Sequence, residues 1–180
     1  MKKNVPNFVV VICTQILAAS PLFAHPGHGL PSLLHGILHP LQGVDHLVAA
    51  LVVGILAARG GNSVRVGFPL AFASGVLWGG FCGFQQISLP FLEGGILLSI
   101  GVLLCMFLLP KRIAPQWLVL GIAVLGGYHG NAHALECGVD TNAMLYAGGF
   151  ILSTLLLQGL GILVGWQIYG EKLTKAPSVN

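Results

Sequence analysis

Residues 36–58 read GILHPLQGVDHLVAALVVGILAA, an apolar run with a single charged side chain, Asp45. At 1.5 Å per residue such a run, folded as an α-helix, is long enough to cross the ~30 Å hydrocarbon layer of a membrane. The run also holds Pro40 and Gly43, which interrupt or bend helices because proline lacks a backbone N–H and glycine adopts unusual dihedral angles. We therefore expect a membrane-spanning helix that begins or bends near these two residues.

The rest of the 180-residue chain is similarly apolar. Of its residues 55% are hydrophobic and 7% are charged, with a mean hydropathy of +0.87, whereas a soluble domain carries about 25% charged residues. This composition argues against a water-soluble monomer and excludes a disordered chain. The net charge of +3 is too small for a nucleic-acid-binding face, and four cysteines without a CxxC pair argue against a disulfide or zinc-ribbon framework. The sequence predicts an all-α polytopic membrane protein that contacts lipid and binds no nucleic acid.

The N-terminus has the layout of a secretory signal peptide. Lys2 and Lys3 precede an apolar stretch over residues 8–19, and Ala24 is the expected last residue of the leader. An uncleaved first span is the alternative. In both cases the chain from His25 onward begins outside the cytoplasm. The expected division is a signal peptide (1–24), an extracytoplasmic segment (25–35), a transmembrane domain (36–170) and a cytoplasmic tail (171–180).

Five apolar runs of spanning length follow the leader. Their alternation from the outside places all eight lysines and arginines on the cytoplasmic side, as the positive-inside rule requires. All seven histidines, and every acidic residue except Glu171, fall in the outer half or the outer loops. We expect a bacterial-type inner-membrane protein with five transmembrane helices (six if the leader is retained), its N-terminus outside and its C-terminus in the cytoplasm. The expected spans are 36–58, 66–84, 91–109, 115–135 and 143–169.

Glycines recur at every fourth residue in three of these spans. Such small-xxx-small rows allow helix backbones to approach closely in lipid. We therefore interpret the rows as helix-packing surfaces. They comprise Gly75, Gly79 and Gly83, then Gly126 and Gly130, then Gly161 and Gly165.

The outer end of the first span carries candidate metal ligands. On one continuous helix His39 and His46 share a face within about 20°, and Asp45 lies about 100° from His46. A buried aspartate without a partner costs up to ~2.5–3.5 kcal/mol at the membrane centre. Because no lysine or arginine is expected on this side of the membrane, a bound cation is the expected partner. A plain interfacial Asp–His pair that meets water is the alternative.

A second group of candidate ligands lies at the outer end of the fourth span. His129, His133 and Glu136 follow i, i+4, i+7 spacing and fall within an arc of about 60° on a helix. Two imidazoles and a carboxylate suit a divalent transition metal, since imidazole favours nickel, copper, cobalt or zinc over magnesium and calcium. Each segment supplies only two or three donors, so we expect the two segments to meet around one divalent ion.

Five further residues are weaker candidates for metal binding. After cleavage of the leader, His25 would present an α-amine and an imidazole that chelate a metal loosely. His35 and Glu93 can equally face the outer interface. Cys137 adjoins Glu136, although a copper(I) site is disfavoured without a thiolate-rich shell. The weaker candidates are His25, His28, His35, Glu93 and Cys137.

The two segments resemble those of the HupE/UreJ family of nickel/cobalt permeases. The resemblance rests on a leader that ends before His-Pro, on HPLQGVDH at 39–46 and on YHGNAHALE at 128–136, and it extends over nearly the whole chain. The first motif has an H-x5-DH pattern, and the second has the family's aromatic-HG-x-x-H-x-x-E form. Tyr128 replaces the family's usual Phe, and Ala134 replaces a usual Gly, which bears on helix approach or selectivity.

The resemblance implies a function and a set of site residues. It implies uptake of Ni²⁺, or Co²⁺, as a transported substrate for nickel enzymes such as hydrogenase or urease. We expect no tightly bound cofactor, and the sequence gives no basis for an oligomeric state. The residues to which the resemblance points are His39, Asp45, His46, His129, His133 and Glu136.

Other functions stay open as alternatives. A membrane b-type haem protein would take one histidine ligand from each segment, and a metal sensor or a nickel-enzyme maturation factor would bind the ion without moving it. An intramembrane hydrolase would need a Ser–His dyad. Ser74 and Ser99 are expected near mid-membrane, farther than a hydrogen bond from the outer histidines, so we do not expect an enzyme.

The inner halves of the spans lack ionisable residues. A path from the outer site to the cytoplasm must therefore use neutral polar side chains, backbone groups or a helix rearrangement. The available side chains include Ser74, Ser99, Ser153, Thr154 and Gln158, and nothing in the sequence selects among them.

Overall fold

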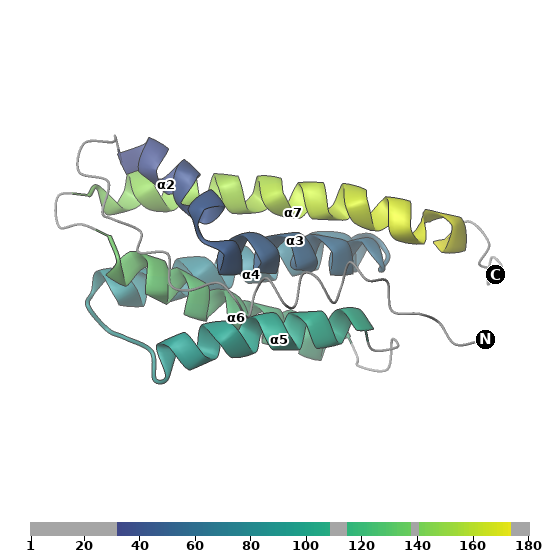
Figure 1. Cartoon of the computed structure of the whole chain (residues 1–180), viewed down its shortest axis with the longest axis horizontal. Coiled ribbons are helices and arrows are strands. Elements are labelled where there is room, and N and C mark those ends of the chain that lie inside the picture. Colours follow the sequence, from purple (N-terminus) through teal and green to yellow (C-terminus); the bar gives the residue numbers. More distant parts are fainter. Residues whose placement is uncertain (1–31, 109–114, 138–140, 174–180) are drawn as a thin grey trace.

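A computed structural model describes residues 32–108, 115–137 and 141–173. Within these ranges all regular structure is helical (Figure 1), which confirms the all-α fold. The expected leader, with His25 and His28, lies outside the described residues. The helices are α2 (Ser32–Gln42), α3 (Val44–Ala58), α4 (Asn62–Phe84), α5 (Leu92–Leu108), α6 (Pro115–Leu135) and α7 (Ala143–Leu173).

Helices α4 to α7 coincide with the last four expected spans to within four residues at each end. Two of them, α4 and α7, are long and apolar enough to cross a membrane. The pair α2–α3 adds a third crossing if it is taken as one span, and α5 is apolar but shorter. The count of five crossings stays a prediction.

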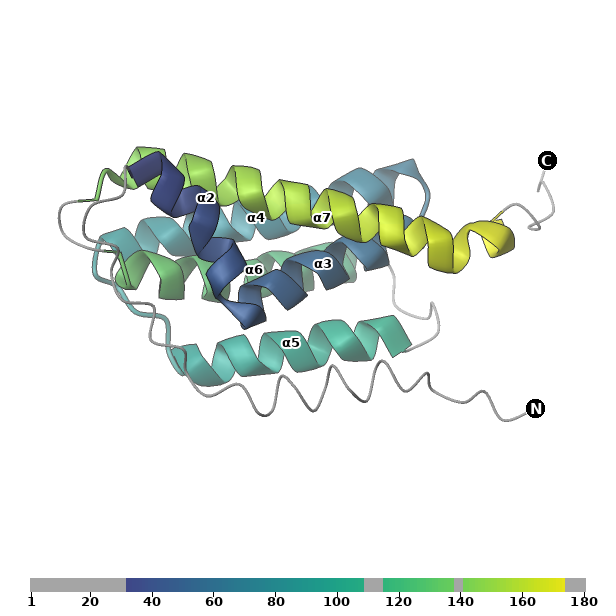
Figure 2. The same ribbon diagram turned by 45° about the horizontal axis from the view of Figure 1, so that its top comes forward.

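The first expected span is broken in two. Helices α2 and α3 meet at 80° around Gly43, whose backbone is extended (φ −89°, ψ 111°), and Figure 2 shows the sharp corner between them. Pro40 lies inside α2 and cannot donate a backbone hydrogen bond, while the Leu47 N–H donates to the Gly43 carbonyl at 3.0 Å in the first turn of α3. The expected bend is confirmed. The single helix face expected for His39 and His46 is wrong, because the two residues lie on different helices.

Glycines bring the helices into close contact. Helix α4 packs mainly on α6, and α7 packs on α2 and α3. A Cβ atom at Gly75 or Gly79 would collide with the backbone of α6, and one at Gly130 would collide with the backbone of α4. A Cβ atom at Gly54 would likewise collide with the backbone of α7, and one at Gly161 would collide with the backbone of α3. The glycine rows are helix contacts, as predicted, and they fix the spacing of the helices that carry the histidines.

Arg59 lies at the opposite end of the bundle from the described histidines. Arg59 is thirteen residues after His46 in the chain, about 20 Å farther along the helix axis. Its guanidinium donates to the backbone carbonyls of Met106 and Phe107 at 3.0 and 3.2 Å. These carbonyls belong to the last turn of α5, where the helix dipole favours a positive charge. The expected polarity, with histidines at one end and basic residues at the other, is present in the described helices.

Candidate metal site

Helices α2, α3 and α6 bring the predicted histidines together. His39 Nε2 lies 2.9 Å from His133 Nδ1, although the two residues are 94 positions apart in the sequence. One ring nitrogen each of His46, His129 and His133 also lies within 4.8 Å of the other two. The expected meeting of the two segments is therefore confirmed.

Five imidazole rings form a continuous row through this interface. His46 and His129 are completely buried, and the other three histidines are nearly so. The row runs from the first turn of α2 to the contact between α6 and α5. Successive ring centroids are 5.5 Å apart for His35 and His39, 4.7 Å for His39 and His133, 5.3 Å for His133 and His46, and 5.3 Å for His46 and His129.

Two overlapping groups within the row have the geometry to hold a metal ion. We call His39, His133 and Glu136 the outer cluster, and His46, His129 and His133 the inner cluster; in each, one ligand atom per residue lies within 4.8 Å of the others. The Glu136 side chain is 55% exposed, whereas the inner cluster is buried throughout. The donors thus form two neighbouring clusters instead of the single set expected from the sequence.

His133 is a member of both clusters. Its Nδ1 faces the outer cluster, 2.9 Å from His39 Nε2 and 3.4 Å from Glu136 Oε2. Its Nε2 is buried and has no hydrogen-bond partner among the described residues. One imidazole therefore connects the outer cluster to the inner one.

A threonine on α7 orients His46. The Thr154 hydroxyl donates its only hydrogen to the backbone carbonyl of Phe150 at 2.8 Å, so it accepts a hydrogen bond from His46 Nε2 at 2.9 Å. His46 must then carry its proton on Nε2, which leaves a lone pair on Nδ1. That Nδ1 is buried without a hydrogen-bond partner among the described residues. Its lone pair is therefore available to bind a metal ion.

A serine on α5 orients His129 in the same way. The Ser99 hydroxyl donates to the backbone carbonyl of Ile96 at 2.6 Å and accepts from His129 Nε2 at 2.8 Å. The Nδ1 atom of His129 is again buried and unpartnered within the described structure. Both fully buried histidines therefore present Nδ1 lone pairs.

This contact corrects the expectation that Ser99 lies beyond hydrogen-bonding reach of the histidines. Ser99 is seven residues into α5 and His129 is six residues before the end of α6. Both residues are therefore about 10 Å from the same end of the bundle. The pair does not resemble a hydrolytic dyad, because the serine is completely buried and its hydrogen is donated to a backbone carbonyl.

Glu136 supplies the negative charge of the outer cluster. It follows the last residue of α6, and its Oε2 lies 3.4 Å from His133 Nδ1 and 3.5 Å from His39 Nε2. Hydrogen bonds from His133 and His39 lower the pKa of the Glu136 carboxyl to about 2, although partial burial acts in the opposite direction. The carboxylate is therefore ionised at every physiological pH and favours a cation at the entrance.

Asp45 lies beside the clusters but belongs to neither. It is half-buried in the first turn of α3, where its negative charge interacts favourably with the N-terminal end of the helix dipole. That interaction gives the aspartate a structural reason for its position. A direct role of Asp45 in metal binding stays a prediction.

The weaker candidates that the structure describes, His35, Glu93 and Cys137, lie outside both clusters. His35 packs its ring against His39 and Tyr146, with centroids 5.5 and 5.2 Å apart, and Glu93 is exposed in the first turn of α5. Burial raises the pKa of the Cys137 thiol to about 11. Because the thiolate is the form that binds metal, Cys137 is a poor ligand at neutral pH.

Asn131 is a structural residue that the sequence analysis did not single out. Its fully buried side chain donates to the carbonyls of Gly79 and Ile87 at 3.1 and 2.8 Å and accepts from the Leu89 N–H at 2.9 Å. It thereby ties the α4–α5 connection to α6, between His129 and His133. The sequence feature that could have indicated it is its position within YHGNAHALE (128–136), between the candidate ligands His129 and His133.

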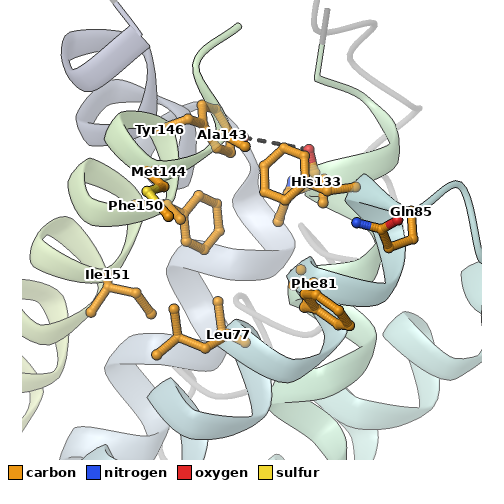
Figure 3. A pocket seen from close by; sticks show the side chains of 15 residues that line it. Leu77, Phe81, Gln85, His133, Ala143, Met144, Tyr146, Phe150 and Ile151 are labelled. Atoms are coloured by element: carbon orange, nitrogen blue, oxygen red, sulfur yellow. Dashed lines mark hydrogen bonds between the residues drawn. The ribbon is translucent and has the colours of Figure 1, made fainter. Parts of the chain in front are cut away.

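An apolar cavity of about 350 Å³ reaches the histidine row between α4 and α7. Figure 3 shows Leu77 and Phe81 on one side and Phe150 on the other, with His133 at the wall. The Tyr146 hydroxyl donates to the His133 carbonyl at 3.5 Å and ties α7 to α6 there. His133 is the one member of the row that lines this cavity.

The helices and the clusters define a helical membrane protein with a histidine-rich site near one end of its bundle. The family model described as HupE / UreJ protein matches residues 12–178, and the chain belongs to this family. It is also 32% identical over 155 residues to Protein HupE of Rhizobium leguminosarum bv. viciae, an alignment that covers 84% of this chain and 81% of that protein. No solved structure matches the chain. The family and the apolar helices together make this an integral membrane protein.

The two departures from the family pattern are accommodated without loss of a donor atom. The Tyr128 hydroxyl donates to the Pro90 carbonyl at 3.4 Å. The methyl group of Ala134 faces Gly83, where an added Cβ would lie only 2.7 Å from it. The glycine on α4 therefore provides the space that the alanine on α6 fills.

Proposed function

We propose that this protein is a secondary permease that takes up divalent nickel, or cobalt, through the outer and inner clusters. The observation that carries the proposal is that His133 belongs both to the outer cluster, whose Glu136 is exposed, and to the buried inner cluster. Its Nδ1 lies 2.9 Å from His39 Nε2, and its buried Nε2 has no hydrogen-bond partner among the described residues. An ion can pass between the clusters while this one imidazole stays in reach. The choice of nickel or cobalt comes from the resemblance of the two motifs to the family's permeases.

The donor atoms are compatible with that choice. Imidazole nitrogens with one carboxylate favour nickel, cobalt, copper or zinc over magnesium and calcium. A copper(I) ion would prefer thiolates, and Cys137 holds its thiol proton. The donor set therefore supports a divalent transition-metal ion as the substrate.

The two clusters suit successive steps of dehydration. The outer cluster has a charged carboxylate in contact with solvent, so it can attract an ion that keeps part of its water shell. The inner cluster offers three neutral nitrogens in a buried space, so the ion gives up more water there. Nickel binding to imidazole requires the neutral ring, and the Thr154 and Ser99 hydroxyls favour a tautomer whose Nδ1 is unprotonated.

The membrane potential supplies a driving force in this proposal. Moving one elementary charge across 100 mV is worth ~2.3 kcal/mol, so a divalent ion gains ~4.6 kcal/mol. The Walker pattern GxxxxGK[ST] does not occur in the sequence. The proposal therefore uses a potential that is negative inside and not ATP hydrolysis.

Uptake of radioactive nickel by cells tests the proposal. We expect accumulation with the wild-type protein and its loss with His46→Ala, His129→Ala or His133→Ala at equal membrane abundance. Tyr128→Phe serves as a matched control, because it alters a side chain next to His129 without touching either cluster. Equal accumulation by the wild type and the three histidine variants would contradict the proposed site.

Purified protein separates the permease from its alternatives. We expect reconstituted vesicles to accumulate nickel when the potential is negative inside. Binding of nickel without accumulation would favour a sensor or a maturation factor. A Soret absorption band in the purified protein would favour haem.

A further inference from the structure

Gln158 is a fully buried side chain on α7 whose polar atoms are unpartnered. Its exposed fraction is 0%, and neither Nε2 nor Oε1 has a hydrogen-bond partner among the described residues. Buried carboxamides are hydrogen-bonded in the great majority of proteins, and an exception calls for a bound group such as water or an ion. Packing alone therefore does not explain why this carboxamide is buried, and Gln158 is a candidate for binding a polar group or an ion.

Its position continues the histidine row towards the other end of the bundle. Gln158 follows Thr154 by four residues, so the two side chains share a face of α7 and lie one helical turn apart. Thr154 holds His46 by a hydrogen bond of 2.9 Å. The Gln158 backbone packs on Gly54 of α3, eight residues beyond His46. Gln158 is thus one turn beyond Thr154 along α7 and about two turns beyond His46 along α3, between these two helices and deeper than the inner cluster.

The surroundings leave the carboxamide without another role. Residues 47–58 of α3 are all apolar or glycine, so that helix supplies no side chain to pair with Gln158. The next polar groups along α3 belong to Arg59, which is engaged with the end of α5. Gln158 is thus the buried polar side chain that lies between α3 and α7, at a level between the inner cluster and Arg59.

We propose that Gln158 forms a relay site that receives the divalent cation, directly or through a water of its shell, after the ion leaves the inner cluster. This inference rests on the proposed permease function. The amide oxygen is a neutral, weak ligand for such an ion, and the amide N–H groups can hold an accompanying water. Weak binding is what a relay requires, because conduction needs an ion to leave each site as readily as it enters.

The relay predicts a separation of transport from binding. In Gln158→Met the apolar side chain has similar length, and we expect the initial rate of radioactive nickel uptake into reconstituted vesicles to fall about tenfold. Calorimetric titration of the same full-length protein with nickel chloride should give an affinity within about threefold of the wild type, since both clusters are intact. Thermal unfolding should occur at the wild-type temperature or above, because the carboxamide removed has no hydrogen bond to lose.

A second apolar variant and a control exclude a general defect. Gln158→Leu should reproduce the loss of uptake, and Leu156→Met, on the exposed face of the same helix, should transport as the wild type does. Wild-type uptake by Gln158→Met would overturn the relay while leaving the proposed function intact. Loss of nickel binding or a lower unfolding temperature would also overturn it, since Gln158 would then belong to the capture site or to the fold. A wild-type protein that neither binds nor accumulates nickel would refute the proposed function itself.

Discussion

Thr154 connects His46 to the backbone of α7: its hydroxyl accepts from the imidazole at 2.9 Å and donates to a carbonyl at 2.8 Å. Because the single hydroxyl hydrogen is already donated, the contact determines which nitrogen of His46 carries the proton. Ser99 repeats the arrangement on α5 with His129. The ability of the inner cluster to bind a metal ion therefore depends on two hydroxyls that would not themselves contact the ion.

Thr154→Val should weaken nickel binding without unfolding the protein. Valine has nearly the shape of threonine but cannot accept the hydrogen bond that fixes the His46 tautomer. Loss of such an orienting partner typically lowers metal affinity about 10- to 100-fold. Calorimetric titration of the purified protein measures the effect. Thr154→Ser keeps the hydroxyl and should bind as the wild type does, and equal affinity in the valine variant would show that the hydroxyl is dispensable.

The sequence was a good guide to the helices and to which side chains lie together. Apolar runs bounded by charges located α4 to α7 to within four residues at each end, because a membrane span must be apolar along its whole length. The Pro40–Gly43 pair indicated the corner between α2 and α3 for a local reason, a missing backbone donor followed by a flexible residue. Spacing on α6 likewise identified His133 and Glu136 as neighbours.

The division into two clusters was not apparent from the spacing. Residues 129 and 136 share a helix face, but seven residues correspond to about 10.5 Å along the axis, and the two side chains belong to different clusters. His133, midway between them, is therefore the residue that both clusters share. The hydroxyls of Ser99 and Thr154 come from helices without a motif, and their contacts depend on how α5 and α7 pack in three dimensions.

The two clusters should have separable kinetic effects. His39→Ala removes an outer donor and leaves the inner cluster complete, so we expect a higher half-saturating nickel concentration with a smaller change in maximal uptake. His129→Ala removes an inner donor, so we expect the maximal rate to fall. Initial rates over a range of nickel concentrations measure both parameters. The same kinetic change in both variants would indicate one site instead of two.

Nickel binding should weaken as the pH falls below neutral, because the metal competes with protons for neutral imidazoles. Glu136 does not contribute to this change. Its pKa in the folded protein is about 2, lowered from an ordinary 4.5 by hydrogen bonds from His133 and His39. Any stabilisation from its charge is therefore fully present above pH 4.5 and is lost only as the pH falls towards 2.

Glu136→Gln tests that assignment. The variant should bind nickel more weakly at every pH, because the negative charge is gone, but its affinity should show the same dependence on pH as the wild type. Titrations at several pH values measure both properties. A flat profile in the variant would mean that the carboxylate, and not the imidazoles, titrates in this range.

Gly75→Ala should destabilise the bundle. The added Cβ would collide with the Ala123 carbonyl oxygen, and overpacking of this kind costs about 1–3 kcal/mol. Gly101, on α5, has no atom within 4 Å of an added Cβ, so Gly101→Ala should be neutral or stabilising by about 0.4–1 kcal/mol. Denaturant or thermal unfolding in detergent measures both. Equal stability of the two variants would show that α4 and α6 can move apart at Gly75 without a loss in the free energy of unfolding.

Asn131→Ala should release the α4–α5 connection while leaving every candidate ligand in place. The alanine cannot donate to the carbonyls of Gly79 and Ile87 or accept from the Leu89 N–H, so residues 85–91 lose their attachment to α6. Hydrogen exchange over these residues should become faster, and nickel affinity should fall because His129 and His133 flank the site of the change. Asn131→Asp keeps the acceptor for Leu89 but places a buried carboxylate oxygen against the carbonyls of Gly79 and Ile87, so its exchange should be at least as fast as that of the alanine variant. Unchanged exchange in the alanine variant would mean that the connection is held by its own backbone, including the left-handed residues Gln86 and Phe91.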